Sequence, residues 1–313
     1  MTETLDLIVI GAGMAGINAA KKCSQAGWSV AIVDELPYGG TCALRGCDPK
    51  KMLRAGAEAV EAVRLLEGKG VAGETRIDWP TLMKHKESFT DPVPESMESA
   101  LTEAGVKTLH GRARFTAEDR IEIDGYGEIA FRRALIATGA KPRPLKFPGA
   151  ERLIDSTDFL NLAELPRRIA FVGGGYISFE FAHIAALAGA EVTILDRGAR
   201  QLKMFDPELV KMLLERSREA GIKIAAEAEM ERIEDANGAR RVLYRRAGQS
   251  HSIEADLVVH GAGRVPAIDH LDLAAADIET EHGGVKVMPW LQCGRRRCRL
   301  ARKAADPGSC VRR

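Results

Sequence analysis

Two cysteines separated by four residues are the side chains in this sequence that are best suited to redox chemistry. Cys42 and Cys47 lie in the segment Gly39-Gly-Thr-Cys-Ala-Leu-Arg-Gly-Cys-Asp-Pro-Lys, at the start of a helical pattern. At a helix start, the helix dipole and nearby cations favour the thiolate, which is the reactive form of cysteine. Taken alone, such a pair is more often two buried thiols. A metal site is less favoured, because no second Cys or His pair at ligand spacing lies nearby.

The residues before this pair have the pattern of a strand–helix–strand unit that binds a dinucleotide. The apolar run Leu5–Ile10 ends in Gly11-Ala-Gly13-Met-Ala-Gly16, a helical pattern follows, and a second apolar run closes on Asp34. In such a unit the first glycine permits a tight turn, the second lets the backbone approach a pyrophosphate, and the third lets helix and strand pack closely. The helix N-terminus faces the phosphates, and the acid accepts a hydrogen bond from a ribose hydroxyl.

The same unit recurs later in the chain. An apolar run, Arg168–Val172, leads into the turn Gly173-Gly-Gly175, the helical pattern Tyr176–Ala188 and a second strand that closes on Asp196. The spacing from first glycine to acid is the same in both copies, and Ser178 occupies the third glycine position. One such motif is weak evidence, whereas two in full strand–helix–strand context are strong. No phosphate-loop motif occurs, so nucleotide hydrolysis is not supported.

Between and after the two units lie further predicted elements. Helical patterns run from Lys50 to about Lys69 and from Trp79 to Ala104. A short strand leads into Ala137-Thr-Gly139, the proline-rich segment 141–148 is typical of a linker, and segment 257–266 ends the second unit.

The bulk composition is that of a globular protein. The chain has 313 residues, enough for two domains, with 45% hydrophobic and 28% charged residues. A net charge of +1 provides no general attraction for nucleic acid or an anionic membrane. The sequence shows neither a signal peptide nor a membrane span, so we expect a cytoplasmic protein. Six cysteines in that compartment indicate redox or metal chemistry rather than structural disulfides.

From about Leu5 to Val287 the sequence resembles the pyridine nucleotide-disulfide oxidoreductases of the glutathione reductase, dihydrolipoamide dehydrogenase and mercuric reductase type. The resemblance rests on GAGMAG, GGTC with GC-P-K, the ATG segment, GGGYISFE and GAGRVP, in family order. It implies an α/β fold with two Rossmann-like domains, the NAD(P)H domain inserted into the FAD domain. We expect an FAD-binding domain over 1–148, an NAD(P)H-binding domain over 149–268 and a truncated return to the FAD domain over 269–313.

The resemblance also implies roles for individual residues. Cys42 would exchange with a small disulfide substrate and Cys47 would contact the flavin. Lys50 would sit near the reactive flavin nitrogen and pair with Glu180, and Tyr176 would cover the nicotinamide pocket. The alternatives are a surface Lys50, a core Tyr176 and a solvated Glu180. No metal site is expected. The residues expected to bind the two nucleotides are Gly11, Gly13, Gly16, Asp34, Gly40, Thr41, Lys51, Thr138, Gly139, Gly173, Gly175, Asp196, Arg197, Lys203 and Gly263.

Several residues depart from the family pattern or conflict with one another. Leu44 replaces the common asparagine, and Arg45 and Asp48 replace apolar residues beside the cysteines; Arg45 should favour the thiolate and Asp48 should oppose it. Asp196 favours NADH, because a carboxylate repels a 2′-phosphate. Three basic residues nearby favour NADPH, to which we lean slightly; they are Arg197, Arg200 and Lys203.

The resemblance ends after Val287. The family continues with a Gly-Asp strand and an interface domain that forms the homodimer and supplies a His-Glu acid/base pair. Here an arginine-rich tail follows instead, for which we infer a shifted or prematurely ended reading frame. We therefore expect the interface domain to be absent, the homodimer to be doubtful and disulfide turnover to be weak.

Three functions remain open from the sequence. The first is an FAD-dependent NAD(P)H:disulfide oxidoreductase. The second is a flavin diaphorase or oxidase that does not use the cysteines. The third is a truncated, inactive nucleotide-binding remnant.

Overall fold

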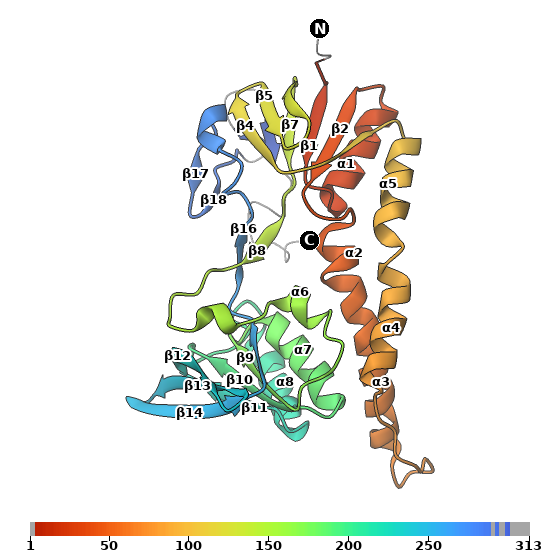
Figure 1. Cartoon of the computed structure of the whole chain (residues 1–313). Coiled ribbons are helices and arrows are strands. Elements are labelled where there is room, and N and C mark those ends of the chain that lie inside the picture. The colour runs from red at the N-terminus through yellow and green to blue at the C-terminus, as the bar shows by residue number, and fades with distance from the viewer. Residues whose placement is uncertain (1–3, 289–291, 294–297, 301–313) are drawn as a thin grey trace. The chain divides into compact units, whose positions relative to one another are not determined.

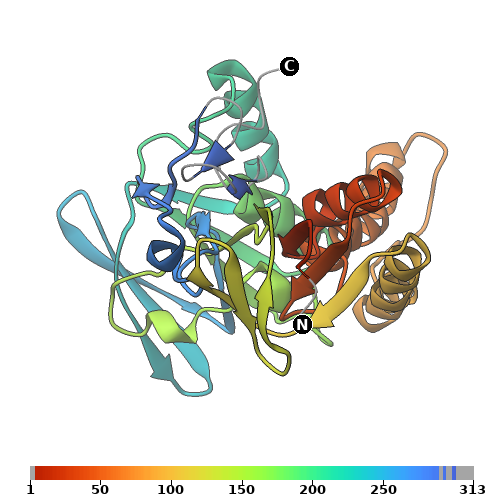
Figure 2. The same ribbon diagram turned by 90° about the horizontal axis from the view of Figure 1, so that it is seen from above.

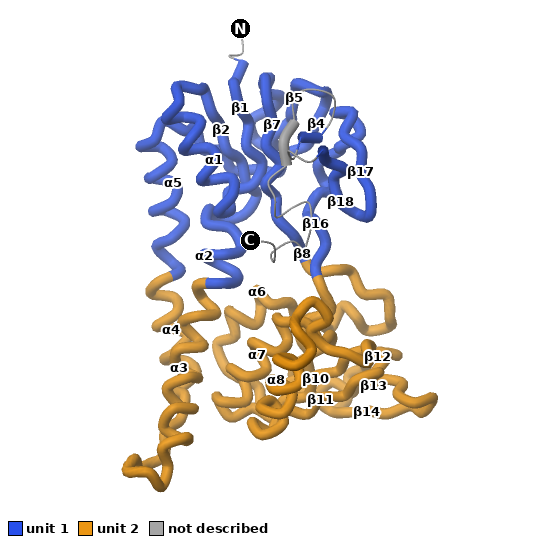
Figure 3. The backbone as a smooth tube through the Cα atoms, turned by 180° about the vertical axis from the view of Figure 1, so that it is seen from behind, with its two compact units in different colours: residues 1–47, 90–141, 264–313 blue, residues 48–89, 142–263 orange. Residues whose placement is uncertain are grey.

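The computed structural model describes residues 4–288, 292–293 and 298–300, the last three without their side chains. Contacts between residues divide the chain into two compact units, coloured blue and orange in Figure 3. Unit 1 contains residues 1–47, 90–141 and 264–313, and unit 2 contains residues 48–89 and 142–263. Each unit is therefore assembled from segments that are distant in the sequence.

Unit 1 is built on a mainly parallel sheet. Its described strands follow the order β19 (Gln292–Cys293), β20 (Cys298–Leu300), β7 (Ala134–Ile136), β1 (Leu7–Ile10), β2 (Val30–Asp34) and β3 (Lys107–His110). The central strands are apolar along their length, as expected for a sheet covered on both faces. Helix α1 (Met14–Gln25) lies beside β1 and β2, as Figures 1 and 2 show.

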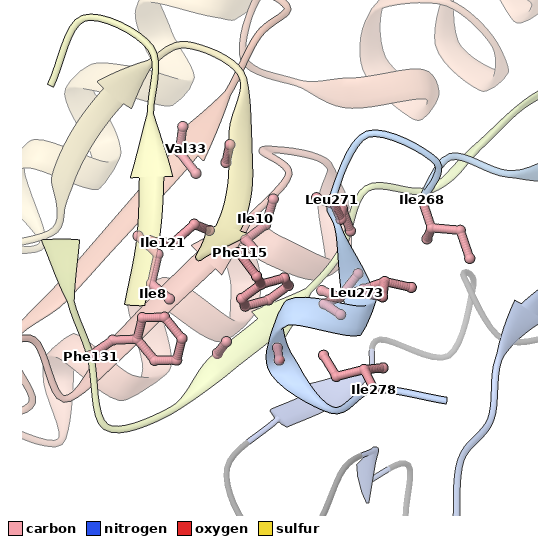
Figure 4. Packing of buried hydrophobic residues seen from close by; sticks show 14 of the residues in the cluster. Ile8, Ile10, Val33, Phe115, Ile121, Phe131, Ile268, Leu271, Leu273 and Ile278 are labelled. Carbon is pink, nitrogen blue, oxygen red and sulfur yellow. The ribbon is translucent and has the colours of Figure 1, made fainter. Parts of the chain in front are cut away.

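The described part of unit 1 has two clusters of buried hydrophobic residues, and a second layer of the unit packs against one of them. The antiparallel strands β4 (Ala113–Ala117), β5 (Arg120–Ile123) and β6 (Gly127–Ala130) form this layer with the short helix η2 (Leu273–Ala276). Side chains from β1, β4, β5 and η2 face one another in Figure 4. Phe115 makes two contacts in this layer. Its ring packs edge-on against Phe131, and its N–H donates to the Leu271 carbonyl at 2.8 Å.

Unit 2 repeats the parallel strand–helix arrangement. Its sheet follows the order β11 (Lys223–Ala226), β10 (Glu191–Asp196), β9 (Arg168–Val172) and β15 (Leu257–His260). Helix α7 (Tyr176–Leu187) connects β9 to β10 and helix α8 (Pro207–Glu219) leads to β11. The antiparallel strands β12 (Glu229–Ala236), β13 (Ala239–Arg246) and β14 (Gln249–Ala255) follow. Both predicted strand–helix–strand units, and with them the α/β class, are confirmed.

The compact units do not follow the ranges expected for the domains, 1–148, 149–268 and 269–313, because unit 2 runs from 142 to 263 and also contains residues 48–89. Helix α3 (Cys47–Leu66), after its first residue, and helix α4 (Trp79–Thr90) up to residue 89 belong to unit 2. Hydrogen bonds account for the attachment of α4: Trp79 Nε1 donates to the Leu162 carbonyl at 2.8 Å, and Lys86 Nζ donates to the Leu160 carbonyl at 3.0 Å.

The single helical pattern predicted over Trp79–Ala104 is wrong. The structure has two helices there, α4 and α5 (Val93–Glu103), and the chain passes from unit 2 to unit 1 at the last residue of α4. Pro92 stands at the break, because a proline lacks the N–H needed inside a helix and disfavours helical backbone at the residue before it.

The arginine-rich tail contains two short strands that its lack of apolar periodicity did not indicate. β20 runs parallel to β7, and the antiparallel β19–β20 register places Cys293 opposite Cys298. Cys293 is buried in the core of unit 1. The rest of the tail lies outside the described residues. Among the described helices, none is both long enough and apolar enough to cross a membrane.

A half-buried histidine in unit 2 leads to a prediction about pH. Burial lowers the pKa of His183 from its ordinary value of 6.5, and its Nε2 lies 2.9 Å from Ser217 Oγ. The unfolded chain therefore binds more protons than the folded chain as the pH falls through 6.5, so the stability of unit 2 should decrease there. In urea unfolding followed by circular dichroism, His183→Gln should reduce this loss between pH 7.5 and 5. The exposed His282→Asn should leave it unchanged, and an undiminished loss in His183→Gln would contradict the assignment.

Candidate functional site

The glycine turn after β1 brings backbone against backbone. Gly11 has a φ of +108°, and a Cβ on it would lie 2.4 Å from the Ala137 carbonyl oxygen at the end of β7. A Cβ on Gly16 would lie 2.0 Å from the Gly11 oxygen. Only glycine fits at these two positions, so the start of α1 is held close to the carboxyl ends of β1 and β7.

The acid at the end of β2 is fixed by the same turn. Asp34 accepts a hydrogen bond from the Ala12 N–H at 2.7 Å through Oδ2 and from the Leu36 N–H at 2.9 Å through Oδ1. A carboxylate oxygen can accept more than one hydrogen bond, so both oxygens keep capacity for a hydroxyl donor. The acid is thus oriented beside the glycine turn, and its ribose-binding role stays a prediction.

The segment that carries the cysteines packs directly onto the glycine turn. Gly40 has a φ of +64°, and a Cβ on it would lie 2.5 Å from the Gly13 Cα. The Gly39 N–H donates to the Ala12 carbonyl at 3.0 Å. Two regions that the sequence separates by about one strand–helix–strand unit therefore meet at glycine–glycine contact.

The two cysteines lie on successive helices. Cys42 is in the short helix α2 (Gly40–Leu44), and Cys47 is the first residue of α3; both are half-buried. The turn between them is tight, since the Arg45 N–H donates to the Thr41 carbonyl at 3.0 Å and a Cβ on Gly46 would lie 2.9 Å from the same oxygen. Cys47 is thus placed at the N-terminus of a long helix.

A buried hydroxyl next to this site has no partner in the protein. Thr138 Oγ1 is enclosed and makes no hydrogen bond within the described chain. It follows β7 in the loop that Gly11 contacts, and Gly139 beside it has a φ of +70° with open space where a Cβ would be. An unsatisfied buried hydroxyl is costly, and a bound polar molecule would relieve it. This hydroxyl, the cradle of glycines and Asp34 together fit a flavin dinucleotide.

Some of the predicted catalytic residues come together in unit 2. Lys50, on α3, donates from Nζ to Glu180 Oε1 on α7 at 2.5 Å, and their side chains are 21% and 41% exposed. Tyr176, at the first position of α7, is 53% exposed and therefore is not a core residue. Lys51 points elsewhere, since it forms an exposed ion pair with Asp48 at 3.8 Å.

The second glycine turn is as crowded as the first. Gly173 has a φ of +110°, and a Cβ on it would lie 2.5 Å from the Ala262 Cα. Gly175 precedes α7, and a Cβ there would lie 3.2 Å from the Gly261 oxygen. Ser178 is fully buried at the third glycine position, and its unpartnered Oγ would lie 1.8 Å from a Cβ on Gly261. A small residue is thus sufficient there because a glycine stands opposite it.

The acid of the second unit, Asp196, ends β10, and the loop that follows carries the cations. Arg197 and Lys203 are exposed, and neither side chain has a hydrogen-bond or ion-pair partner in the described part of the chain. Arg200 is used differently, because its Nη2 donates to the carbonyls of Lys203 and Phe205 at 3.0 and 2.9 Å. Gly263 lies just after β15, with a φ of +102° and its carbonyl accepting from the Arg143 N–H.

Sequence reasoning missed two residues of this loop region. Gln201 is 4% exposed, and its Nε2 donates to Asp196 Oδ2 at 3.1 Å. Gly174, the middle glycine, has no room for a side chain because a Cβ there would lie 2.5 Å from the same oxygen. The three consecutive glycines were a signal for Gly174, whereas no local pattern marks Gln201.

The histidines described in unit 2 have structural partners. His183 contacts Ser217, and His260 Nε2 lies 2.8 Å from the Arg143 carbonyl oxygen. Among the described residues, no group of three or more His, Cys, Asp or Glu side chains is arranged to hold a metal ion.

Comparisons with known proteins agree with this arrangement. The profile of the family described as pyridine nucleotide-disulphide oxidoreductase matches residues 5–296. Glutathione reductase of Burkholderia cepacia is 34% identical over 284 residues, which are 90% of this chain and 62% of that protein. Mercuric reductase of Lysinibacillus sphaericus is 31% identical, over 89% of this chain and 52% of that protein.

A solved structure is also similar. The HOCl-induced flavoprotein disulfide reductase RclA from Escherichia coli has a TM-score of 0.84 at 27% identity, over 94% of this chain and 65% of that one. The chain thus spans between half and two thirds of the length of these relatives.

The glycine–glycine contact can be tested by two matched substitutions. Gly27→Ala should cost about 1 kcal/mol, because Gly27 has a φ of +84° but open space where a Cβ would be. Gly40→Ala adds a collision with Gly13 to a similar φ, so we expect about 2–4 kcal/mol from urea unfolding. Equal losses in the two variants would show that the close approach contributes nothing to stability.

Proposed function

Because the chain belongs to the pyridine nucleotide-disulphide oxidoreductase family, we propose that it carries electrons from NAD(P)H through FAD to the Cys42–Cys47 pair and on to a small disulfide. Members of the family bind FAD and NAD(P)H. The observation that most supports the proposal is the packing of Gly40 on Gly13, which joins the cysteine segment to a dinucleotide-binding turn.

Unit 1 would bind the flavin dinucleotide through its backbone. Gly11, Gly13 and the N-terminus of α1 would face the pyrophosphate, and Asp34 would accept from a ribose hydroxyl. The Thr138 hydroxyl would gain the partner that it lacks. When bound, FAD supplies the step that converts a hydride from the nicotinamide into two electrons for a disulfide. The other steps belong to side chains of this chain.

The cysteines would carry out the exchange with substrate. Two electrons and a proton break the Cys42–Cys47 bond and leave a thiolate and a thiol. The Cys42 thiolate then attacks the substrate disulfide to form a mixed disulfide, and the thiolate that leaves takes the proton of the Cys47 thiol. Attack of the resulting Cys47 thiolate on Cys42 Sγ expels the second substrate thiolate, which takes a proton from solvent, and restores the original bond. Cys47 lies at the start of α3, and Arg45 stands two residues before it in the sequence.

Three residues of unit 2 would serve the nicotinamide side. Lys50 would place a positive charge where reduced flavin gains negative charge, and Glu180 would keep that lysine paired and oriented. Tyr176, exposed at the start of α7, would cover the nicotinamide site. Gly173, Gly175 and Gly263 would line the dinucleotide, with NADPH preferred over NADH because Arg197 and Lys203 are free to bind a 2′-phosphate within the described structure. The cytoplasmic location and the doubtful homodimer remain predictions.

The cysteines distinguish this function from that of a diaphorase. Cys42→Ser and Cys47→Ser should each abolish NADPH-dependent reduction of glutathione disulfide or lipoamide, because the exchange needs both sulfurs. Reduction of a quinone dye should continue in both variants, and Cys23→Ser, on α1, should retain both activities. Disulfide reduction that survives in Cys47→Ser would favour a diaphorase that does not use the pair.

A spectroscopic measurement supports the same test without turnover. Anaerobic addition of one equivalent of NADPH to the purified chain should produce the long-wavelength absorbance of a thiolate beside oxidised flavin. Cys47→Ser should lack this band throughout, whereas oxidised Cys42→Ser should show it before any NADPH is added, because its Cys47 thiolate has no disulfide partner. A chain that retains no flavin would instead be a nucleotide-binding remnant.

The Lys50–Glu180 pair leads to a kinetic prediction. Lys50→Met removes a charge that would stabilise reduced flavin, so reduction by NADPH in a stopped-flow instrument should slow by about tenfold or more. The matched control is Lys84→Met, which replaces an exposed lysine on α4 of the same unit and should leave the rate unchanged. Equal rates of flavin reduction in Lys50→Met and the unsubstituted chain would show that Lys50 does not act in this step.

A further inference from the structure

The second acid, Asp196, is held differently from its counterpart Asp34. Asp34 accepts from two backbone N–H groups, one on each oxygen. Asp196 accepts from the side-chain amide of Gln201, which reaches Oδ2 from the loop that follows β10. The two strand–helix–strand units thus use equivalent acids in different hydrogen-bonding environments.

One oxygen of Asp196 is enclosed. Besides the bond from Gln201, Oδ2 lies 2.5 Å from the position of a Cβ on Gly174 and 3.3 Å from that of a Cβ on Gly198. Gln201 itself is 4% exposed, and its amide also donates to the Gly198 carbonyl at 3.1 Å. Oδ2 therefore already accepts a hydrogen bond and is enclosed by the backbone at Gly174 and Gly198, which leaves Oδ1 as the main acceptor for a ligand.

The loop that follows β10 is held by a backbone hydrogen bond and carries cations beside the carboxylate. The Leu202 N–H donates to the Gly174 carbonyl at 3.0 Å, with Leu202 in the left-handed region at a φ of 47°. Lys203 Cε lies 3.2 Å from the position of a Cβ on Gly198, so the lysine stem and the Asp196 carboxylate flank the same glycine. A ligand at this edge meets a carboxylate that already accepts a hydrogen bond, next to the side chain of Lys203, which has no partner among the described residues.

We propose that Gln201 is a positioning residue that sets nucleotide selectivity by occupying Oδ2 of Asp196. A carboxylate normally selects against a 2′-phosphate and for a free 2′-hydroxyl. A bond from a buried amide reduces the negative potential that the carboxylate presents and takes up one of its two acceptor oxygens. The acid therefore tolerates a 2′-phosphate, which Arg197 and Lys203 can then bind. This inference rests on the proposed NAD(P)H function. Gln201 would explain how a loop that contains Asp196 can still bind a 2′-phosphate through its cations.

The test compares binding of NAD⁺ and NADP⁺ to the full chain by calorimetry, with saturating FAD so that the flavin site is filled. Gln201→Met removes the donor but keeps the length of the side chain. It should lower the preference for NADP⁺ over NAD⁺ by about fivefold, the scale of one typical net hydrogen bond. Gln249→Met, an exposed glutamine on β14 of the same unit, should leave the preference unchanged.

A double-mutant cycle separates this role from a merely structural one. In an Asp196→Asn background the carboxylate charge is gone, so Gln201→Met should change the preference by less than about twofold. An unchanged preference in the single variant, or an equal change in both backgrounds, would overturn the proposal. If neither nucleotide binds the unsubstituted chain, the proposed function itself fails, and the inference fails with it.

Discussion

The whole arrangement depends on backbone segments approaching one another more closely than any side chain would allow. At Gly11, Gly40 and Gly173 the chain turns with positive φ against another backbone segment, at distances that a single methyl group would block. These contacts place a helix N-terminus at the carboxyl end of a parallel sheet, where backbone N–H groups are available to an anion. In unit 1 they also fix the cysteine segment to the turn. The candidate site is therefore built mainly from main chain.

The parts of this fold that follow from local pattern could be predicted from the sequence. The glycine spacings and the acids that follow them predicted both strand–helix–strand units, because tight turns and buried strands leave short, regular signals. The apolar pattern continues past Pro92, so periodicity alone predicted one helix where the structure has two. The helix is interrupted at Pro92 because a proline has no N–H to donate within a helix.

The parts that depend on distant contacts could not be predicted. The attachment of α4 to unit 2 rests on Trp79 and Lys86, whose partners Leu162 and Leu160 are far away in sequence. The bond from Gln201 to Asp196 spans only five residues, but it depends on a loop conformation with no sequence signature. The unsatisfied Thr138 hydroxyl likewise becomes visible only when the space around it is known. The two polar features most informative about ligands were thus absent from the sequence argument.

The interleaving of the two units constrains the order in which the chain can fold during synthesis. Unit 2 is bounded by residues 48 and 263, so all of it leaves the ribosome before the last segment of unit 1 exists. The core of unit 1 needs that late segment, because Leu271 accepts from Phe115, and Ile278 and Val285 pack with Ile8 and Ile10. During translation, one apolar face of β1 and its neighbouring strands therefore stays exposed while unit 2 folds. Unit 1 begins first and is completed last, so we expect chaperones to bind mainly to this exposed face of unit 1.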